Sequence, residues 1–395
     1  MATPATCPLC RSNYCELVLR IQDTPVHQHV TGVTETEARA CPRAEVALTL
    51  CRACGFVFNA AFEPHRLRYS PGYENAQTYS KVFQSYLDSL VADLARRYEL
   101  AGKTVVEIGC GEGVFLERLH EVTGCNGVGF DPSYNSERGA QRQGCTFAAS
   151  IYDPAHPDSV GEVVCARHVV EHLWRPIDLV RDFVRALPAR SGCAWIETPR
   201  LEWILEQRAF WDIFYEHCSY FTMPVLAALL TRHGFVVTRH RPAFADQYQW
   251  LEAQQTGDGH QVPDAVSCSV DDLAGKLREF ADAWTTWRDT WQWRLRALAG
   301  EGPCVMWGAG AKGVMFLNHV EAGVDVVQAV VDLNPRKQGR FVPGTGQPII
   351  PPAAVRQIAA RTVLVANSNY LTEIRDLLRQ QGCDPDVLVL EQTAS

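Results

Sequence analysis

Short apolar runs alternate with helical stretches over most of this chain. Between residues 103 and about 240, strand-like runs occur at 104–109, 127–131, 162–168, 193–198 and 234–240. A second β-α-β unit begins near residue 302, with further runs at 303–307, 324–331 and 361–368. Such alternation is typical of doubly wound, mostly parallel sheets covered by helices. The pattern therefore predicts an α/β protein with two domains of this type.

Two stretches have the three- and four-residue spacing of apolar positions that predicts an amphipathic helix. The first covers residues 74–98, and the second runs from Ser269 to about residue 300. Ser269 is expected to cap the second helix, with Asp272 three residues later. The polar segment 254–268 contains glycine and proline, so it is predicted to be a loop or linker. Four tryptophans of the second helix are expected to pack in a core or an interface: Trp284, Trp287, Trp291 and Trp293.

The first 64 residues differ in composition from the rest of the chain, because they are rich in cysteine, proline and histidine. They contain two CxxC pairs, formed by Cys7 with Cys10 and by Cys51 with Cys54. Each pair can present two thiolates from a tight turn, and two pairs complete the tetrahedral sulfur set that Zn²⁺ prefers. We therefore expect a structural zinc site, with an intervening hairpin that accounts for the long spacing. Unligated thiols and a redox dithiol are the alternatives.

These textures predict a zinc-binding module at 1–70, a central domain at 71–255, and a helical linker with a C-terminal domain at 256–395. The 395 residues are 47% hydrophobic with a net charge of −8, which excludes a mainly disordered chain and argues against broad nucleic-acid binding. No run approaches the roughly 18 apolar residues of a membrane span. The N-terminus lacks the basic and apolar regions of a secretory signal. A cytoplasmic location without nucleic-acid or membrane partners is expected.

A glycine-rich loop follows the first strand of the central domain. Gly109, Gly111 and Gly113 have the spacing GxGxG, whereas a dinucleotide fingerprint has the spacing GxGxxG. Glu107 precedes them near the end of the strand, where an acid suits a cationic, amino-acid-bearing ligand. The next strand ends in Asp131, which can accept hydrogen bonds from both hydroxyls of a ribose. An NAD site and a structural loop without a cofactor are the alternatives.

An acid, three glycines in this spacing and an acid after the next strand resemble the class I S-adenosylmethionine-dependent methyltransferases. The resemblance implies a Rossmann-like central domain. It also implies contacts to the adenine from Tyr152 and Asp153, and a cofactor contact from His168 at the end of the fourth strand. The complete set of cofactor residues is then Glu107, Gly109, Gly111, Gly113, Asp131, Tyr152, Asp153 and His168.

A second glycine-rich loop, at 308–313, follows the strand-like run at 303–307. Alone it is a weak GxGxxG motif, and Asp332 after the next strand would also fit NAD. Lys312 inside the loop suggests a phosphate-bearing partner at a helix N-terminus, and a solvated lysine is the alternative. The C-terminal domain is therefore predicted to be a second Rossmann-like unit.

The three parts together, with the stretch at 332–339, resemble the zinc-containing S-adenosylmethionine-dependent sugar C-methyltransferases over almost the whole chain. Members of that family act on nucleotide-linked keto-deoxysugars. They use a Tyr-His-Glu-His stretch whose last histidine is the proposed general base. The matching stretch here is Phe214, Tyr215, Glu216 and His217, so the chain looks like a divergent member that differs at the first two positions.

This resemblance implies catalytic roles for His217, Glu216 and Tyr215. The unperturbed pKa of histidine, about 6.5, suits a base that removes a proton next to a ketone. Tyr215 or Tyr220 would donate a hydrogen bond to the enolate oxygen. His217 could instead be a buried core histidine. The residues expected to contact the acceptor, a small molecule and in this family a nucleotide sugar, are Tyr73, His172, Phe214, Lys312, Gly308 and Gly310.

Other interpretations stay open. Glu171, beside His172, is expected to be a solvated or packing residue. The acceptor could be another small molecule or a carrier-bound intermediate, methylated on carbon, nitrogen or oxygen. The chain could also be a non-catalytic binding module that uses the zinc site.

Overall fold

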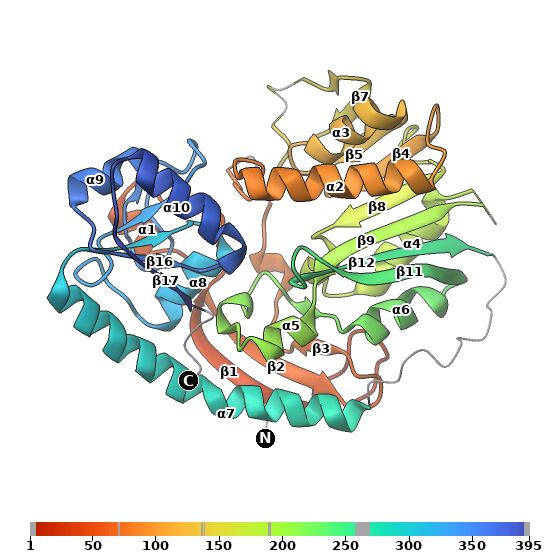
Figure 1. Cartoon of the computed structure of the whole chain (residues 1–395). Helices are drawn as coiled ribbons and strands as arrows, with labels where there is room; N and C mark the ends of the chain where they lie inside the picture. The colour runs from red at the N-terminus through yellow and green to blue at the C-terminus, as the bar shows by residue number, and fades with distance from the viewer. Residues whose placement is uncertain are drawn as a thin grey trace.

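The chain forms three β-sheets in the computed structural model (Figure 1). The structure describes residues 5–69, 72–135, 137, 139–188, 191–256 and 269–390. One sheet belongs mainly to the N-terminal module, one to the central domain and one to the C-terminal domain. The predicted linker at 254–268 lies largely outside the described residues, because the structure describes only its first three positions.

The N-terminal sheet has four strands, in the order β1-β2-β3-β10. The strands β1 (Cys15–Pro25) and β2 (Arg43–Cys51) form an antiparallel hairpin between the two CxxC pairs, and α1 (Glu35–Arg39) lies in their connection. Next to β3 (Val57–Asn59) lies β10 (Ser219–Tyr220), which comes from the central region of the chain. The hairpin agrees with the sequence prediction, but β10 shows that the N-terminal sheet is completed from beyond residue 70.

The central sheet has eight strands, in the order β11-β12-β9-β8-β4-β5-β7-β6. Its middle is parallel, and β12 pairs antiparallel with both of its neighbours. This is the predicted doubly wound sheet with an antiparallel edge. The bounds are β4 (Thr104–Ile108), β5 (Asn126–Phe130), β6 (Gln141–Arg142), β7 (Cys145–Ala148), β8 (Val163–Arg167), β9 (Cys193–Pro199), β11 (Phe235–Ala243) and β12 (Tyr248–Gln255).

The helices of the central domain are α2 (Lys81–Arg97), α3 (Val114–Thr123), α4 (Pro176–Ala186), α5 (Leu201–Glu206) and α6 (Met223–Thr231). Figure 1 shows α2 lying across the central sheet. The sequence prediction placed the start of α2 at residue 74, which is too early. Ser80 caps the helix, with its Oγ accepting a hydrogen bond from the Phe83 N–H. The preceding residues instead make contacts between domains, such as the hydrogen bond from the Glu74 N–H to the His29 carbonyl.

The C-terminal sheet is parallel, in the order β15-β14-β13-β16-β17. It confirms the second β-α-β unit that the apolar runs predict. Its elements are β13 (Cys304–Trp307), α8 (Ala311–His319), β14 (Ala329–Val331), β15 (Ile349–Ile350), α9 (Val355–Ile358), β16 (Thr362–Val365), α10 (Leu371–Gln380) and β17 (Asp386–Val389).

A single helix, α7 (Val270–Glu301), leads into the C-terminal domain, and Figure 1 shows it running along the outside of the β1–β2 hairpin and the C-terminal sheet. Ser269 caps it as predicted, accepting from the Asp272 N–H. Trp284 and Trp291 are buried, and the Trp287 ring packs against Phe210. The prediction for Trp293 is wrong, because its side chain is exposed. Residue 293 lies about 200° around the helix from residue 291, outside the apolar stripe.

Among the described residues, no helix is both long enough and apolar enough to cross a membrane.

Candidate active site

The first glycine-rich loop joins β4 to α3 with three residues in the left-handed region. Gly109, Gly111 and Gly113 have φ values of 73°, 54° and 81°. A Cβ at Gly109 would lie 2.3 Å from a methyl of Val169, whereas one at Gly111 would meet no atom within 4 Å. The Gly111 N–H donates to Oδ2 of Asp131 at 2.8 Å. The structure thus brings four predicted cofactor residues together around open space.

Glu107 lies buried under this loop at the end of β4. Its Oε1 is 3.8 Å from the Arg167 guanidinium, and among the described residues its buried Oε2 has no hydrogen-bond partner. Burial raises the pKa of Glu107 to about 8, against the opposing effect of Arg167. A buried carboxylate oxygen without a donor is costly, so this atom is suited to receive a donor from a bound cation.

The other three predicted cofactor residues lie at neighbouring strand ends. Tyr152 is buried against Phe130 and donates its hydroxyl hydrogen to the Ser159 carbonyl, whereas Asp153 is exposed. Next to them Ile151 is 76% exposed, and it is an apolar candidate for an aromatic ligand face that the sequence analysis did not assign.

His168 directly follows β8 and has a φ of 55°, which is unusual for a residue with a side chain. Its N–H donates to the Glu197 carbonyl, and its ring packs edge-on against Tyr248. The strained conformation is thus fixed by the neighbouring strand β9 and by β12.

Glu216 is fully buried between the N-terminal module and the central domain. Its Oε1 accepts from the Gln28 N–H and its Oε2 from the Tyr73 hydroxyl, both at 2.6 Å. Burial raises the pKa of Glu216 to about 7, although these hydrogen bonds oppose the shift. Tyr73 therefore lies in the site where the sequence placed it. The contribution of the Gln28 backbone from the N-terminal module was not foreseen.

His217 is half-buried beside Glu216. Its ring centroid lies 3.9 Å from that of Phe214 and 4.9 Å from that of His172. Burial, with His172 as the next contribution, holds the pKa of His217 well below 6.5. Nδ1 of His172 is hydrogen-bonded to the Tyr69 hydroxyl at 2.9 Å. His217, Phe214 and His172, which were all predicted to be site residues, therefore form one cluster.

Glu171 belongs to the same cluster and is 2% exposed, so of the two predicted roles, solvated or packing, the structure favours the packing one. One carboxylate oxygen accepts from the Thr198 hydroxyl, and the other lies 3.3 Å from Nδ1 of His168. Ligand atoms of Glu171, His172 and His217 lie within 4.8 Å of one another, a spacing that could hold a metal ion. Both Glu171 oxygens already have neighbours, so the arrangement is satisfied without one.

Tyr215 does not face this cluster, which corrects its predicted catalytic placement. Its hydroxyl accepts a hydrogen bond from the Glu63 N–H, and its ring packs on Phe62 in the N-terminal module. The hydroxyl of Tyr220 bonds to the backbone of Phe214. Tyr73 and Tyr69 are the tyrosines that contact Glu216 and His172. The chain turns at residues 215 and 216, and the two side chains have different partners: Glu63 for Tyr215, and Gln28 with Tyr73 for Glu216.

The second glycine-rich loop joins β13 to α8. The Ala309 N–H donates to Oδ2 of Asp332 at 2.8 Å. A Cβ at Gly308 or at Gly310 would meet no atom within 4 Å, so this loop also borders open space. Lys312 points elsewhere: its ammonium pairs with the Asp212 carboxylate and lies 4.9 Å from the centre of the Trp203 ring. Lys312 thus joins the C-terminal domain to the central domain.

The segment after Asp332 connects the two loops through two cationic residues. The sequence had predicted no role for either of them. Arg336 pairs with Glu112 of the first loop at 2.6 Å and with Glu74 at 3.3 Å. Lys337 is buried and donates from Nζ to the Ala309 carbonyl of the second loop at 2.8 Å. The sequence feature that could have identified these two residues is that they are adjacent cations in a polar segment.

The four cysteines of the CxxC pairs come together at one end of the N-terminal sheet. Their sulfur atoms lie within 4.8 Å of one another, with 3.8 Å between Cys7 and Cys54 and 3.5 Å between Cys10 and Cys51. Four converging thiol groups fit the tetrahedral site of a structural zinc ion.

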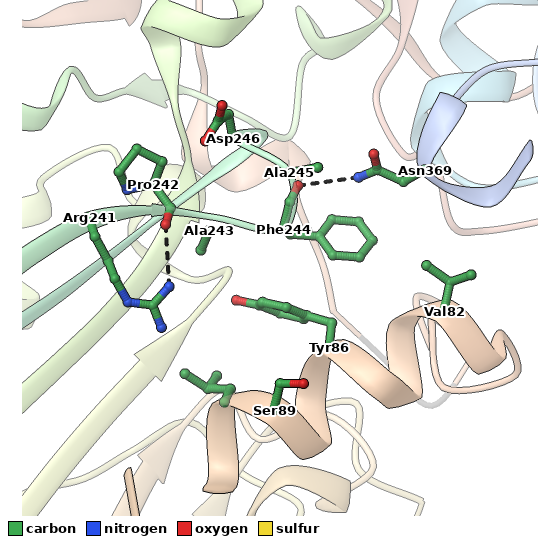
Figure 2. A pocket seen from close by; sticks show the side chains of 11 residues that line it. Val82, Tyr86, Ser89, Arg241, Pro242, Ala243, Phe244, Ala245, Asp246 and Asn369 are labelled. Atoms are coloured by element: carbon green, nitrogen blue, oxygen red, sulfur yellow. Dashed lines mark hydrogen bonds between the residues drawn. The ribbon is translucent and has the colours of Figure 1, made fainter. Parts of the chain in front are cut away.

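A cavity of about 530 Å³ lies between α2 and the β11–β12 turn, with Asn369 of the C-terminal domain at its edge (Figure 2). Tyr86, Arg241 and Phe244 line it. None of the predicted site residues does so, and the cavity is distinct from the cluster around His217.

Residues 80–240 match a family model described as a methyltransferase domain, and residues 268–383 match one described as a C-methyltransferase C-terminal domain. The C-methyltransferase NovU of Streptomyces niveus is 29% identical over 290 residues, which are 70% of this chain and 69% of that protein. The first match covers most of the central domain, and the second covers α7 with most of the C-terminal sheet.

Two solved structures illustrate the similarity of the central domain. Magnesium protoporphyrin IX methyltransferase from Synechocystis is 18% identical, over 44% of this chain and 84% of that chain, with a TM-score of 0.35. The 1,6-didemethyltoxoflavin-N1-methyltransferase of Burkholderia thailandensis is 15% identical, over 45% and 81%, with a TM-score of 0.34. At these scores neither structure supports an inference about this chain.

Proposed function

Because this chain is an S-adenosylmethionine-dependent methyltransferase with the C-terminal domain of C-methyltransferases, we propose that it methylates a carbon next to a ketone in a nucleotide-linked deoxysugar. The observation that carries the proposal is the position of His217, whose ring packs against His172 and Phe214 beside the buried Glu216–Tyr73 pair. Methylation of carbon needs a nucleophilic carbon, and a neutral histidine can generate one by removing the proton next to a ketone.

The cofactor, when bound, supplies an electrophilic methyl group on a sulfonium. For its binding we assign the first glycine-rich loop with Glu107 and Asp131. The donor set fits: Glu107 offers an unpartnered buried oxygen to an ammonium, and open space surrounds Gly111. Tyr152, Asp153 and His168 complete the assignment at the adjoining strand ends. The ribose hydroxyls would donate hydrogen bonds to the Asp131 carboxylate, as in other Rossmann-like sites.

In the first step, a ring nitrogen of His217 takes the proton from the carbon next to the ketone. The electron pair of the broken C–H bond forms the C=C bond of the enolate, and the carbonyl π electrons move to oxygen. We assign Glu216 and Tyr73 to hold a substrate hydroxyl, and Phe214 and His172 to line the acceptor site. The cofactor, when bound, would supply the methyl group to this enolate carbon, with the electron pair of the carbon–sulfur bond staying on sulfur and the ketone re-forming.

The test is deuterium exchange in D₂O with S-adenosylhomocysteine and a panel of nucleoside-diphosphate 4-keto-deoxysugars. Wild-type enzyme is expected to exchange the proton next to the ketone of one sugar without methylating it. His217→Ala should lower exchange and turnover by about 10²–10⁴-fold, the usual contribution of a general base. His65→Ala, which removes an exposed histidine, is the matched control and should behave as wild type. Normal turnover by His217→Ala would exclude His217 as the base.

A second candidate function is methylation of nitrogen, oxygen or carbon in another small molecule. The observation that favours it is the local departure at Phe214 and Tyr215, since the Tyr215 hydroxyl is bound to Glu63 and cannot assist an enolate there. An acceptor without an acidic C–H needs no histidine base. Binding of cofactor without binding of any sugar nucleotide, together with an active His217→Ala variant, would favour this candidate.

We also propose that the Cys7, Cys10, Cys51 and Cys54 cluster holds a structural zinc ion. Purified protein should contain one zinc per chain by mass spectrometry. Cys10→Ser should lose the metal and lower the melting temperature by about 5 °C or more, because metal binding stabilises the folded state. Cys41→Ser is the control, since Cys41 is a half-buried thiol outside the cluster. A folded wild-type protein without zinc, or a Cys10→Ser variant that keeps it, contradicts the assignment.

A further inference from the structure

Three cations surround the second glycine-rich loop, and two of them are neutralised by carboxylates. Lys312 pairs with Asp212. Arg336 pairs with Glu112 and Glu74, and its side chain is 38% exposed. Neither charge is therefore available to a ligand without breaking an ion pair.

Lys337 differs from both. It is 4% exposed, and among the described residues no carboxylate lies within ion-pair distance of its Nζ. Its hydrogen-bond partner is the Ala309 carbonyl at 2.8 Å. An ammonium has three donors, so a buried lysine with one carbonyl partner has donors left to satisfy.

The surroundings of Lys337 place it between the two halves of the acceptor site. Burial lowers the pKa of Lys337, and the carboxylates of Asp332, Glu74 and Glu216 oppose this shift, so its ammonium is close enough to Glu216 to interact with it electrostatically. On its other side, the bond to Ala309 places Nζ at the loop whose Gly308 and Gly310 border open space.

We propose that Lys337 binds the diphosphate of the acceptor and is the cation that the C-terminal domain contributes to substrate recognition. This inference rests on the proposed nucleotide-linked substrate and replaces Lys312, which the sequence had suggested for this role. An anion that reaches the second loop would accept from the unused donors of the Lys337 ammonium. The bond to Ala309 would hold the ammonium in place, so little side-chain entropy is lost on binding.

Calorimetric titration of dTDP, UDP and GDP into zinc-loaded enzyme saturated with S-adenosylhomocysteine tests the proposal. One of these nucleotides should bind the wild type, and Lys337→Met should weaken its binding at least about tenfold, the effect of losing a charge-assisted hydrogen bond. Lys337→Arg should recover part of the affinity. Binding of S-adenosylhomocysteine and the melting temperature should not change.

Two control variants separate this assignment from general charge effects. Arg340→Met removes an exposed cation from the same segment. The double variant Lys312→Met/Asp212→Asn removes the neighbouring ion pair without leaving an unpaired charge. Both should bind the nucleotide within about threefold of wild type, since neither touches the Lys337 ammonium.

The outcomes are distinguishable. Wild-type binding that Lys337→Met leaves unchanged overturns the role of Lys337 and leaves the proposed function intact. An equal loss of nucleotide and S-adenosylhomocysteine affinity in Lys337→Met also overturns it, because the substitution would then disturb the fold as a whole and not the nucleotide site. Failure of the wild type to bind any nucleoside diphosphate overturns the nucleotide-linked substrate itself, and this inference with it.

Discussion

After β4 and after β13 the chain makes the same turn. In each case the first glycine donates its N–H to a carbonyl of the next strand at 2.7 Å. In each case the aspartate that follows that strand accepts a loop N–H at 2.8 Å. The paired bonds are Gly109 to Phe130 and Gly308 to Val331, then Gly111 to Asp131 and Ala309 to Asp332. The two loops thus begin with the same pair of hydrogen bonds, and only the first continues through two further glycines at positive φ, Gly111 and Gly113.

The buried ionisable groups that distinguish the two loops are an acid at the first and a base at the second. Two residues before its first glycine, the first loop has the buried carboxyl of Glu107, whereas the second has the apolar Met306. The buried charge next to the second loop is the Lys337 ammonium. The glycine spacing therefore fixes where a ligand can approach, and the flanking residues fix the sign of the charge that it should carry. A cationic cofactor suits the first loop and an anionic acceptor group suits the second.

The largest expected effect comes from adding one methyl group to each loop. Gly109→Ala places a Cβ 2.3 Å from Val169 at a φ of 73°, so it combines a clash with backbone strain. Each of these costs about 1–3 kcal/mol, and we expect S-adenosylhomocysteine to bind about 100-fold more weakly. Gly310→Ala meets no atom within 4 Å, so the cofactor affinity and the melting temperature should not change.

Gly310→Ala should instead weaken the binding of a nucleoside diphosphate severalfold, because its methyl group enters the space assigned to the acceptor. Calorimetric titration of each variant with S-adenosylhomocysteine and with the nucleoside diphosphate checks that each substitution weakens the binding of a different ligand. A Gly310→Ala variant that loses cofactor affinity, or a Gly109→Ala variant that keeps it, would show that the two loops do not serve separate ligands.

Local sequence patterns predicted both loops, because each depends on residues that are close in sequence. A strand, a tight turn with glycines at positive φ and a following helix form one continuous segment, as around Gly109. The start of α2 was predicted too early, and Trp293 was wrongly assigned to an interface. Local spacing indicates neither outcome: Glu74 bonds to His29, which is far away in the sequence, and the Trp293 side chain is 71% exposed on α7.

The acceptor site could be predicted only in part, because it is assembled from all three regions of the chain. His217 and Glu216 come from a motif, but the N–H that holds Glu216 belongs to Gln28, 188 positions earlier. Tyr215 occupies a position of the motif, but its side chain does not face the His217 cluster, since its hydroxyl accepts a hydrogen bond from the Glu63 N–H. A local sequence pattern does not indicate which group of a distant module completes a hydrogen bond.

The buried acid of the first loop gives the last expected effect, which is a dependence of cofactor binding on pH. The pKa of Glu107 is about 8 without cofactor, so its carboxyl is mostly protonated at pH 7. A bound ammonium favours the ionised form, so binding should release a proton. By linkage, the affinity for S-adenosylhomocysteine should then rise with pH, by at most about tenfold per unit between pH 6 and 8, and level off above pH 8.

Glu107→Gln should abolish this dependence, because the amide cannot ionise and still fills the same space. Glu216→Gln is the matched control: it removes another buried carboxyl whose pKa is raised, to about 7, and it should leave the pH dependence of cofactor binding intact. Proton release measured by calorimetry in two buffers of different ionisation enthalpy supplies an independent readout. If the affinity of the wild type is flat from pH 6 to 8, Glu107 does not receive the cofactor ammonium. The contrast in charge between the two loops would then rest on Lys337 alone.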